Sequence, residues 1–458
     1  MQHNLEPSMQ HQTIIHHKNE SNYERPWESA NSFGRKFNIL FQSGDVAGLI
    51  SFLESFAKKN PLNRDLIRQA YNQISGFGLS SLANECARVY SEACSQLLEL
   101  GQSEFGLPTI FEFNYQYEID SELVEQTAHT KVLLELGLLT MKPTFPLEKR
   151  KKSNFITAFY PYLEDSFEMV SENHEACATI SQVTRFAPYV PLFYKFSDKK
   201  YGHNSSFAID CYDELIPQNI NISPFQLKPK TTDIATKFLK SFDLSPSDNF
   251  VVFFLREEGF FDEPNFGNNI LNPMDFANSI DYFLQQGLKV VRIGHAKMHP
   301  IFRRKGFIDL TTVERPSEVD IFLCGQAKFY FGSGSGPISL AQTFGTPCCE
   351  INRINYAGVR ADNFAQYLLF GDVITKRKCT FTDITMKGLK YNSSLKPFLD
   401  RKLVPYFPTP QENLKFAKES IDYFNKGEVF NTNVSAKAKR EKFRVWGGVN
   451  TESLGYLE

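Results

Sequence analysis

The chain has 458 residues, of which 42% are hydrophobic and 22% charged, and its formal net charge is −2. These values are typical of a globular protein with two or three domains, and they argue against a disordered chain or a general electrostatic binder of nucleic acid. The eight cysteines are scattered and form no CxxC pair, and no run of about 18 apolar residues occurs. We therefore expect a cytoplasmic protein with reduced thiols and no membrane-spanning helix.

The beginning of the chain is polar and then becomes helical in pattern. Residues 1–34 have no apolar core of the kind found in a signal peptide, so we expect a flexible tail. Over residues 35–105, apolar residues recur at helical spacing, as in Leu49, Leu53 and Phe56. We interpret this stretch as a helical extension that either packs on the rest of the protein or docks a partner.

Residues 106–230 mix strand and helix signals. Residues 109–113 alternate like a strand, residues 132–139 suit a helix, and residues 155–162 suit another strand. We therefore expect an N-terminal α/β domain over 106–230.

Residues 231–430 have the clearest pattern, and residues 431–458 are expected to form a C-terminal tail. Apolar runs predict buried strands at residues 249–255, 289–293, 306–309, 327–331 and 348–351. Helical segments separate these runs, which predicts a parallel sheet with helices on both faces. The many phenylalanines of these runs, such as Phe250 and Phe331, are expected in the core.

Ligands of such sheets bind beyond the carboxyl ends of the strands. Four candidate positions follow from this rule: Arg256 with Glu257, Gly294 with His295, residues Ser333, Gly334, Ser335 and Gly336, and Asn352. The loop between the fourth strand and the next helix is the best local signal, because its glycines let backbone N–H groups approach an anion and the helix presents its positive end. A phosphate or diphosphate suits it; a tight turn that merely needs glycine is the alternative.

Several known motifs do not fit this loop. The third glycine position of the dinucleotide fingerprint is occupied by Pro337 or Ser339, and no Lys-Ser or Lys-Thr follows as in a Walker loop. Neither Ser333 nor Ser335 has the flanking glycines of a nucleophile elbow. Nicotinamide enzymes, P-loop NTPases and serine hydrolases are thereby disfavoured.

The segment after the first of these strands is the second signal. Arg256 could grip a diphosphate through its planar fork, while Glu257 and Asp262 could orient that arginine or act as a base. A surface salt-bridge patch is the alternative for the carboxylates. The polar residues around Asn269 could form the pocket rim, and His295 could donate to a phosphate or a base edge. No Asp-x-Asp occurs and no third ligand joins His295 and His299, so we expect no metal and no cofactor.

Together these stretches resemble a family of bacterial glycosyltransferases found among surface-polysaccharide genes. More distantly, their order is similar to the donor half of GT-B transferases, including heptosyl- and fucosyl-transferring enzymes. The resemblance covers about residues 248–353 and rests on residues 254–257, Asn268-Asn269, residues 291–294, 318–324, 331–336 and 344–347. Asn268 departs from it, since the family pattern has Arg-Asn there.

The resemblance implies two Rossmann-like domains facing a cleft and metal-independent transfer from a nucleotide-sugar bound by the C-terminal domain, residues 231–430. It implies that Arg256 stabilises the leaving diphosphate and that Ser333, Ser335 and Gly336 line its phosphate end. It also places Glu257 where the family has an acidic residue after the arginine. The acceptor would be a hydroxyl of a glycan, a lipid-linked sugar or a protein, which leaves peripheral contact with the inner membrane open. A non-catalytic nucleotide-sugar sensor or partner subunit, and a nucleotide-sugar epimerase, are the rival hypotheses.

Overall fold

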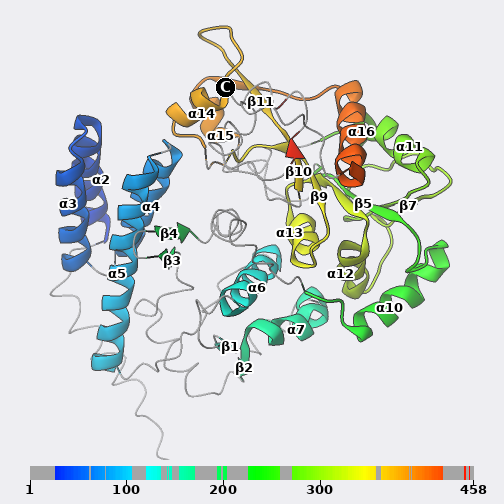
Figure 1. The fold of residues 1–458 in the computed structure, drawn as a ribbon, viewed down its shortest axis with the longest axis horizontal. Helices are drawn as coiled ribbons and strands as arrows, with labels where there is room; N and C mark the ends of the chain where they lie inside the picture. Colours follow the sequence, from blue (N-terminus) through cyan, green and yellow to red (C-terminus); the bar gives the residue numbers. More distant parts are fainter. Residues whose placement is uncertain are drawn as a thin grey trace, which may run out of the picture.

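The computed structural model describes residues 26–60, 63–77, 79–105, 120–135, 142, 144–146, 154–170, 193–197, 200–203, 225–257, 271–356, 363–390, 392, 395–426, 448–449 and 453 (Figure 1). The predicted strand at residues 109–113 lies outside them, as do residues 1–25 of the expected tail. Helix α2 begins at Pro26, so the last residues of the stretch expected as a tail are helical.

The N-terminal helices gather around a core of their own, at the left of Figure 1. They are α2 (Pro26–Ser43), α3 (Val46–Lys59), α4 (Arg64–Gly76) and α5 (Ser80–Phe105). The predicted stripe is confirmed, since Leu49, Leu53 and Phe56 are buried in this cluster with Phe33 and Phe37. The Asp45 side chain caps α3 by accepting a 2.9 Å hydrogen bond from the Gly48 N–H.

The next segments are small strands and two helices. They are α6 (Asp120–Glu135), β1 (Thr144–Pro146), α7 (Asn154–Ser166), β2 (Glu168–Val170), β3 (Phe193–Ser197) and β4 (Lys200–His203). Strands β1 and β2 pair in parallel and β3 and β4 pair antiparallel. The predicted helix at 132–139 overlaps the end of α6. The strand predicted at 155–162 is wrong, because this stretch is helix α7, with Ile156, Phe159 and Leu163 buried at helical spacing.

The main feature of the fold is a seven-stranded sheet in the order β13-β10-β9-β8-β5-β6-β7, parallel throughout. Its strands are β5 (Phe250–Phe254), β6 (Lys289–Arg292), β7 (Phe307–Asp309), β8 (Phe329–Ser333), β9 (Cys348–Arg353), β10 (Asn363–Tyr367) and β13 (Gly448–Val449). The five predicted strands are confirmed, and β10 and β13 add two at one edge. The chain starts the sheet at the interior strand β5 and extends it on both sides, which is the Rossmann arrangement.

Helices cover both faces of this sheet, as predicted (Figure 1). On one face lie α6, α7, α10 (Pro229–Leu239), α12 (Ser317–Gln326) and α13 (Gly336–Thr343). On the other lie the short 3₁₀ helix η7 (Pro273–Phe276), α11 (Ala277–Gln285) and α16 (Pro410–Lys426). Alternate residues of β5 point to opposite faces of the sheet. Phe250 and Val252 pack in the core on the α12 and α13 side, and Val251 and Phe253 pack in the core on the α11 and α16 side.

An antiparallel hairpin follows the sheet strand β10. It comprises β11 (Leu369–Asp372) and β12 (Leu403–Tyr406), with α14 (Phe381–Met386) and α15 (Lys396–Asp400) in the connection between them. Phe370, Phe381 and Phe398 pack beneath it in a separate apolar cluster. In the described part of the chain, no helix combines the length and the apolar character needed to cross a membrane.

Candidate functional site

The candidate site lies where the strand order reverses. Strand β5 pairs with β6 on one side and with β8 on the other, so the connections leaving β5 and β8 go to opposite faces of the sheet. The crevice outside the carboxyl ends of two such strands is the usual ligand position in this kind of sheet. Arg256 lies two residues after the end of β5, Ser333 is the last residue of β8, and Gly334 follows it.

Arg256 is tied to β8 at two points. Its backbone N–H donates to Ser333 Oγ at 3.0 Å, and its guanidinium Nη2 donates to the Gly334 carbonyl oxygen at 3.1 Å. Its own carbonyl accepts from the N–H of Leu271 at 3.0 Å. The side chain is therefore half-buried and held at the reversal point. The structure thus brings together Arg256, Ser333 and Gly334, three of the predicted site residues.

The Arg256 side chain carries a positive charge that no described carboxylate neutralises. Arg292, Arg315 and Arg353 are buried to a similar or greater degree, and each of these forms an ion pair with Asp or Glu. No ion pair of this kind joins Arg256 to any residue in the ranges given above. Burial lowers the pKa of Arg256, which is the direction expected for a cation that lacks a compensating anion.

Close packing of β5 against β8 fixes the start of the loop. A Cβ atom at Gly332 would lie 1.9 Å from the Phe254 carbonyl oxygen, so this position tolerates no side chain. The buried Tyr330 hydroxyl donates to the Ser333 carbonyl oxygen at 2.7 Å. Tyr330 was not predicted as a site residue, because a tyrosine within an apolar strand gives no sign that its hydroxyl supports the following loop.

Ser335 and Gly336 form the entry to α13. Ser335 is the N-cap residue in an extended conformation, and its side chain makes no capping hydrogen bond. Gly334, Ser335, Gly336 and Pro337 are all half-buried. Since Pro337 has no N–H and the Ile338 N–H donates to the Ser335 carbonyl at 3.1 Å, the backbone N–H of Gly336 is the first-turn donor best placed to meet an anion.

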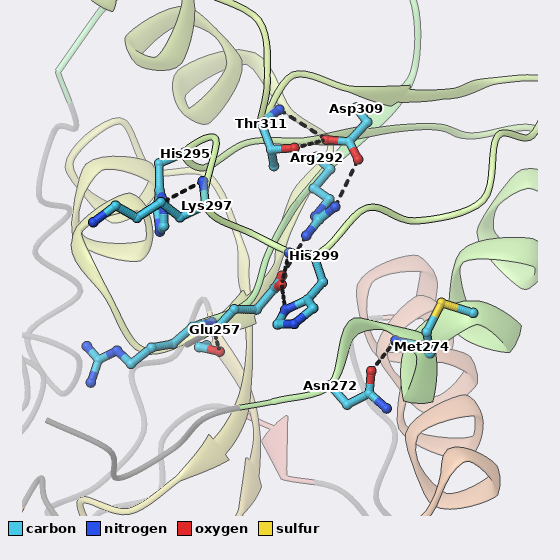
Figure 2. Close-up of polar contacts among 11 residues, drawn as sticks. Glu257, Asn272, Met274, Arg292, His295, Lys297, His299, Asp309 and Thr311 are labelled. Atoms are coloured by element: carbon cyan, nitrogen blue, oxygen red, sulfur yellow. Dashed lines mark hydrogen bonds and ion pairs between the residues drawn. The ribbon is translucent and has the colours of Figure 1, made fainter. Parts of the chain in front are cut away.

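Glu257 points into a buried ionic network with Arg292 and His299 (Figure 2). One carboxylate oxygen lies 2.6 Å from Arg292 Nη2, and the other accepts the backbone N–H of His299 at 2.8 Å. Arg292 also donates to Asp309 at 2.8 Å, and Asp309 accepts two further hydrogen bonds from Thr311. The side chains of Glu257 and Arg292 are both 0% exposed. The network therefore joins the carboxyl ends of β5, β6 and β7.

Gly294 and His295 begin the loop after β6. Gly294 has φ 149°, and a Cβ atom there would lie 2.2 Å from Met298 Sδ, so glycine is required. His295 Nδ1 accepts the Lys297 N–H at 3.3 Å, which leaves the proton of a neutral ring on Nε2 (Figure 2). Burial lowers the pKa of His295, and the ring is therefore mainly neutral at pH 7.

The remaining predicted residues are placed as follows. Asn352 is buried and is the penultimate residue of strand β9, with a left-handed φ of 51°. The adjacent Arg353 forms an ion pair with Glu350, whose Oε1 would lie 2.6 Å from a Cβ at Gly334. Asp262 and Asn269 lie outside the described residues. In the ranges that the structure describes, no group of three or more His, Cys, Asp or Glu side chains is arranged to hold a metal ion.

No protein-family model and no curated protein matches the chain. Among solved structures, a glycosyl transferase family 9 protein from Veillonella parvula is 15% identical, with 51% of this chain and 77% of that chain covered and a TM-score of 0.31. The ADP-heptose LPS heptosyltransferase II of E. coli is 13% identical, with coverage of 50% and 66% and a TM-score of 0.25. Likenesses this low carry no argument about activity, which must come from the geometry of the strand ends.

Proposed function

We propose that this protein is a glycosyltransferase that moves a sugar from a nucleotide-sugar donor to a hydroxyl acceptor. The observation that carries the proposal is the half-buried Arg256, held by Ser333 and Gly334 at the reversal point of the sheet without a described carboxylate partner. A desolvated guanidinium of this kind is stabilised most by an anion that accepts two hydrogen bonds from it, such as a diphosphate. The sequence resemblance around Arg256 and residues 331–336 supports the same assignment.

The reaction breaks the bond between the anomeric carbon and a diphosphate oxygen, and the electron pair stays on that oxygen. Arg256 and the N–H of Gly336 would stabilise the charge that develops there, and the positive end of α13 would add to this effect. The acceptor oxygen forms a new bond to the anomeric carbon, and its proton passes to a base. His295, whose ring is mainly neutral, remains a predicted donor-binding residue.

We assign Glu257 a positioning role instead of the catalytic role predicted from the sequence. Both of its oxygens are engaged by Arg292 and His299, and its side chain is 0% exposed. Through its peptide link to Arg256 it would fix the direction in which the arginine leaves β5. Asp262 remains a predicted catalytic residue that could orient Arg256 or act as a base, and Asn269 and Asn352 remain predicted donor-binding residues.

The test is Arg256→Ala, with Arg303→Ala as the matched control, because Arg303 is an exposed arginine of the loop before β7. We expect R256A to lose about 2–4 kcal/mol of transition-state stabilisation, the range found for removal of a group that stabilises developing charge. The R303A variant should behave as wild type. Transfer and donor hydrolysis are measured against a panel of nucleotide-sugars, and nucleoside diphosphate binding is measured by isothermal titration.

The outcomes separate the rival functions. Full activity of R256A would refute the assignment of the site. Nucleotide binding that R256A abolishes, with neither transfer nor hydrolysis of any donor, would identify a non-catalytic nucleotide-sugar sensor. An isomerised sugar formed without an acceptor would identify an epimerase.

A further inference from the structure

Exposed apolar side chains are concentrated on one part of the surface. The described residues include twelve large hydrophobic side chains that are exposed, and seven of them fall between residues 373 and 407. These seven are Val373, Ile374, Met386, Leu399, Val404, Tyr406 and Phe407. Single exposed apolar residues are ordinary, but a cluster on one surface marks an interaction site.

The β11–β12 hairpin places two of these side chains, Val404 and Tyr406, on its outer face. Residues directly opposite in an antiparallel pair share a face, and here Leu369 pairs with Tyr406 and Gly371 with Val404. The opposite face carries Phe370 and Leu403, which are 1% and 0% exposed in the cluster beneath. Val404 and Tyr406, which are 41% and 46% exposed, therefore lie on the face turned away from Phe370 and Leu403.

The turn that follows β11 extends this outer face. Residues 373–378 are exposed throughout and read Val-Ile-Thr-Lys-Arg-Lys. The Val373 N–H donates to the Lys402 carbonyl oxygen at 3.0 Å, and the Lys402 N–H donates to that of Leu399 at 2.9 Å. The turn thus lies beside the end of α15, and β11, α14 and α15 lie together at the top of Figure 1.

The same region carries an excess of positive charge. Residues 369–407 contain eight basic and three acidic residues, a net charge of +5 in a chain whose overall charge is −2. Each acidic side chain already has a basic partner within the region. These ion pairs are Lys387–Asp372 at 3.2 Å, Arg377–Asp383 at 2.7 Å and Lys396–Asp400 at 2.8 Å. Of the other basic residues of this region, Lys376, Arg401 and Lys402 are exposed and can meet an external anion.

We infer that this surface, the hairpin patch (Val373, Ile374, Lys376, Lys402, Val404 and Tyr406), binds the surface of an anionic lipid bilayer. Apolar side chains can enter the boundary between headgroups and acyl chains while neighbouring lysines meet the negative headgroups. A protein interface would have an apolar centre with the charges at its rim. Here lysines flank the apolar side chains along the same turn and strand, which favours the bilayer.

The patch also has a defined position relative to the sheet. Strand β10 runs parallel to β5 and β8, and β11 begins two residues after β10 ends. The hairpin therefore leaves the sheet at its carboxyl edge, the edge that carries Arg256 and Ser333. The inference rests on the patch alone and does not depend on the proposed function.

The experiment is co-sedimentation of the full chain with vesicles of phosphatidylcholine alone or with 30% phosphatidylglycerol (about one third anionic lipid). The test variant is Ile374→Ser with Lys376→Gln. The matched control is Phe302→Ser with Lys305→Gln, because Phe302 is 70% exposed and Ile374 is 72% exposed. Both variants change exposed residues only, and circular dichroism checks that both fold.

We expect binding to the anionic vesicles only, weakened at least about tenfold in the test variant and unchanged in the control. Added salt should weaken wild-type binding. Three results would overturn the inference: no binding to anionic vesicles at low salt, binding that the test variant leaves unchanged, or a concentration-dependent dimer in light scattering that the test variant abolishes. The last would identify the patch as a contact between two copies of the chain.

Discussion

Arg292 offers the sharpest test of how the carboxyl ends of the strands are held. Replacing it with methionine keeps a long apolar side chain but removes the cation between Glu257 and Asp309. Asp309 would keep its two hydrogen bonds from Thr311 and is 25% exposed. The Glu257 side chain, which is 0% exposed, would keep its contact with His299, including the hydrogen bond from the His299 N–H, but lose its ion pair. The variant therefore leaves one buried carboxylate without its cation.

The magnitude follows from that burial. Removing one partner of a buried ion pair costs about 3–5 kcal/mol, because the remaining charge is left uncompensated. Arg304→Met is the matched control, since Arg304 and its partner Asp281 are 20% and 42% exposed. An exposed pair of this kind contributes about 0–1 kcal/mol. Adding Glu257→Gln to R292M removes the stranded charge and should restore most of the loss.

Urea unfolding followed by circular dichroism measures these differences. We expect the free energy of unfolding to fall in the order wild type, R304M, then R292M, with the double variant E257Q/R292M more stable than R292M. A loss below about 1 kcal/mol in R292M would refute the reasoning, because it would mean that water reaches Glu257. A double variant no more stable than R292M would show that packing, and not charge, dominates.

Two further predictions concern the close approach of two backbones at Gly332 and the ion pair between Arg377 and Asp383. Gly332→Ala places a methyl group against the Phe254 carbonyl oxygen and should lower the free energy of unfolding by about 1–3 kcal/mol. The control Gly34→Ala has open space around it in α2 and should leave the free energy of unfolding unchanged or raise it by up to about 1 kcal/mol. Equal melting temperatures of the two variants would contradict this prediction. The hydrogen bond from Arg377 lowers the pKa of Asp383 to about 2, so the stabilisation by Asp383 is complete above its unfolded pKa of about 3.9 and is lost as the pH falls toward 2. Asp383→Asn should be less stable than wild type at pH 6 and approach it near pH 2, and a difference that does not change with pH would argue against the pairing.

The sheet could be predicted where burial on both faces makes a strand continuously apolar. This holds for Phe250–Phe254 and Phe329–Phe331, which are buried throughout. Strand β10, Asn363–Tyr367, was missed because it buries two polar residues, Asn363 and Gln366, and so lacks the apolar run. Strand β13 has only two residues and pairs with a segment far away in the sequence.

Helix α7 shows where aromatic content misleads. Residues 155–162 are rich in phenylalanine and tyrosine, which suit strands. The buried side chains Ile156, Phe159 and Leu163 instead recur at intervals of three and four residues. Spacing, and not residue type, decided the structure of this segment.

The candidate site was predictable to the extent that it follows from strand ends. Arg256 and the loop at Ser333 come from different strands, and the rule for parallel sheets brings them to one edge, where they are hydrogen bonded. The environment of Glu257 was not predictable in this way. Consecutive residues of an extended chain point to opposite sides, so Glu257 turns from Arg256 toward Arg292, and that contact depends on the pairing of β5 with β6.

The strand order has a further consequence for how the sheet is assembled. Strand β5 is made first and lies in the interior of the sheet, so each later strand can add to an outer edge without displacing an earlier one. The backbone edge of β10 then stays open until Gly448 and Val449 pair with Phe364 and Ala365. During synthesis this edge is a template for strands of other chains. It is covered only when the two-residue strand β13, made more than 80 residues later, pairs with β10.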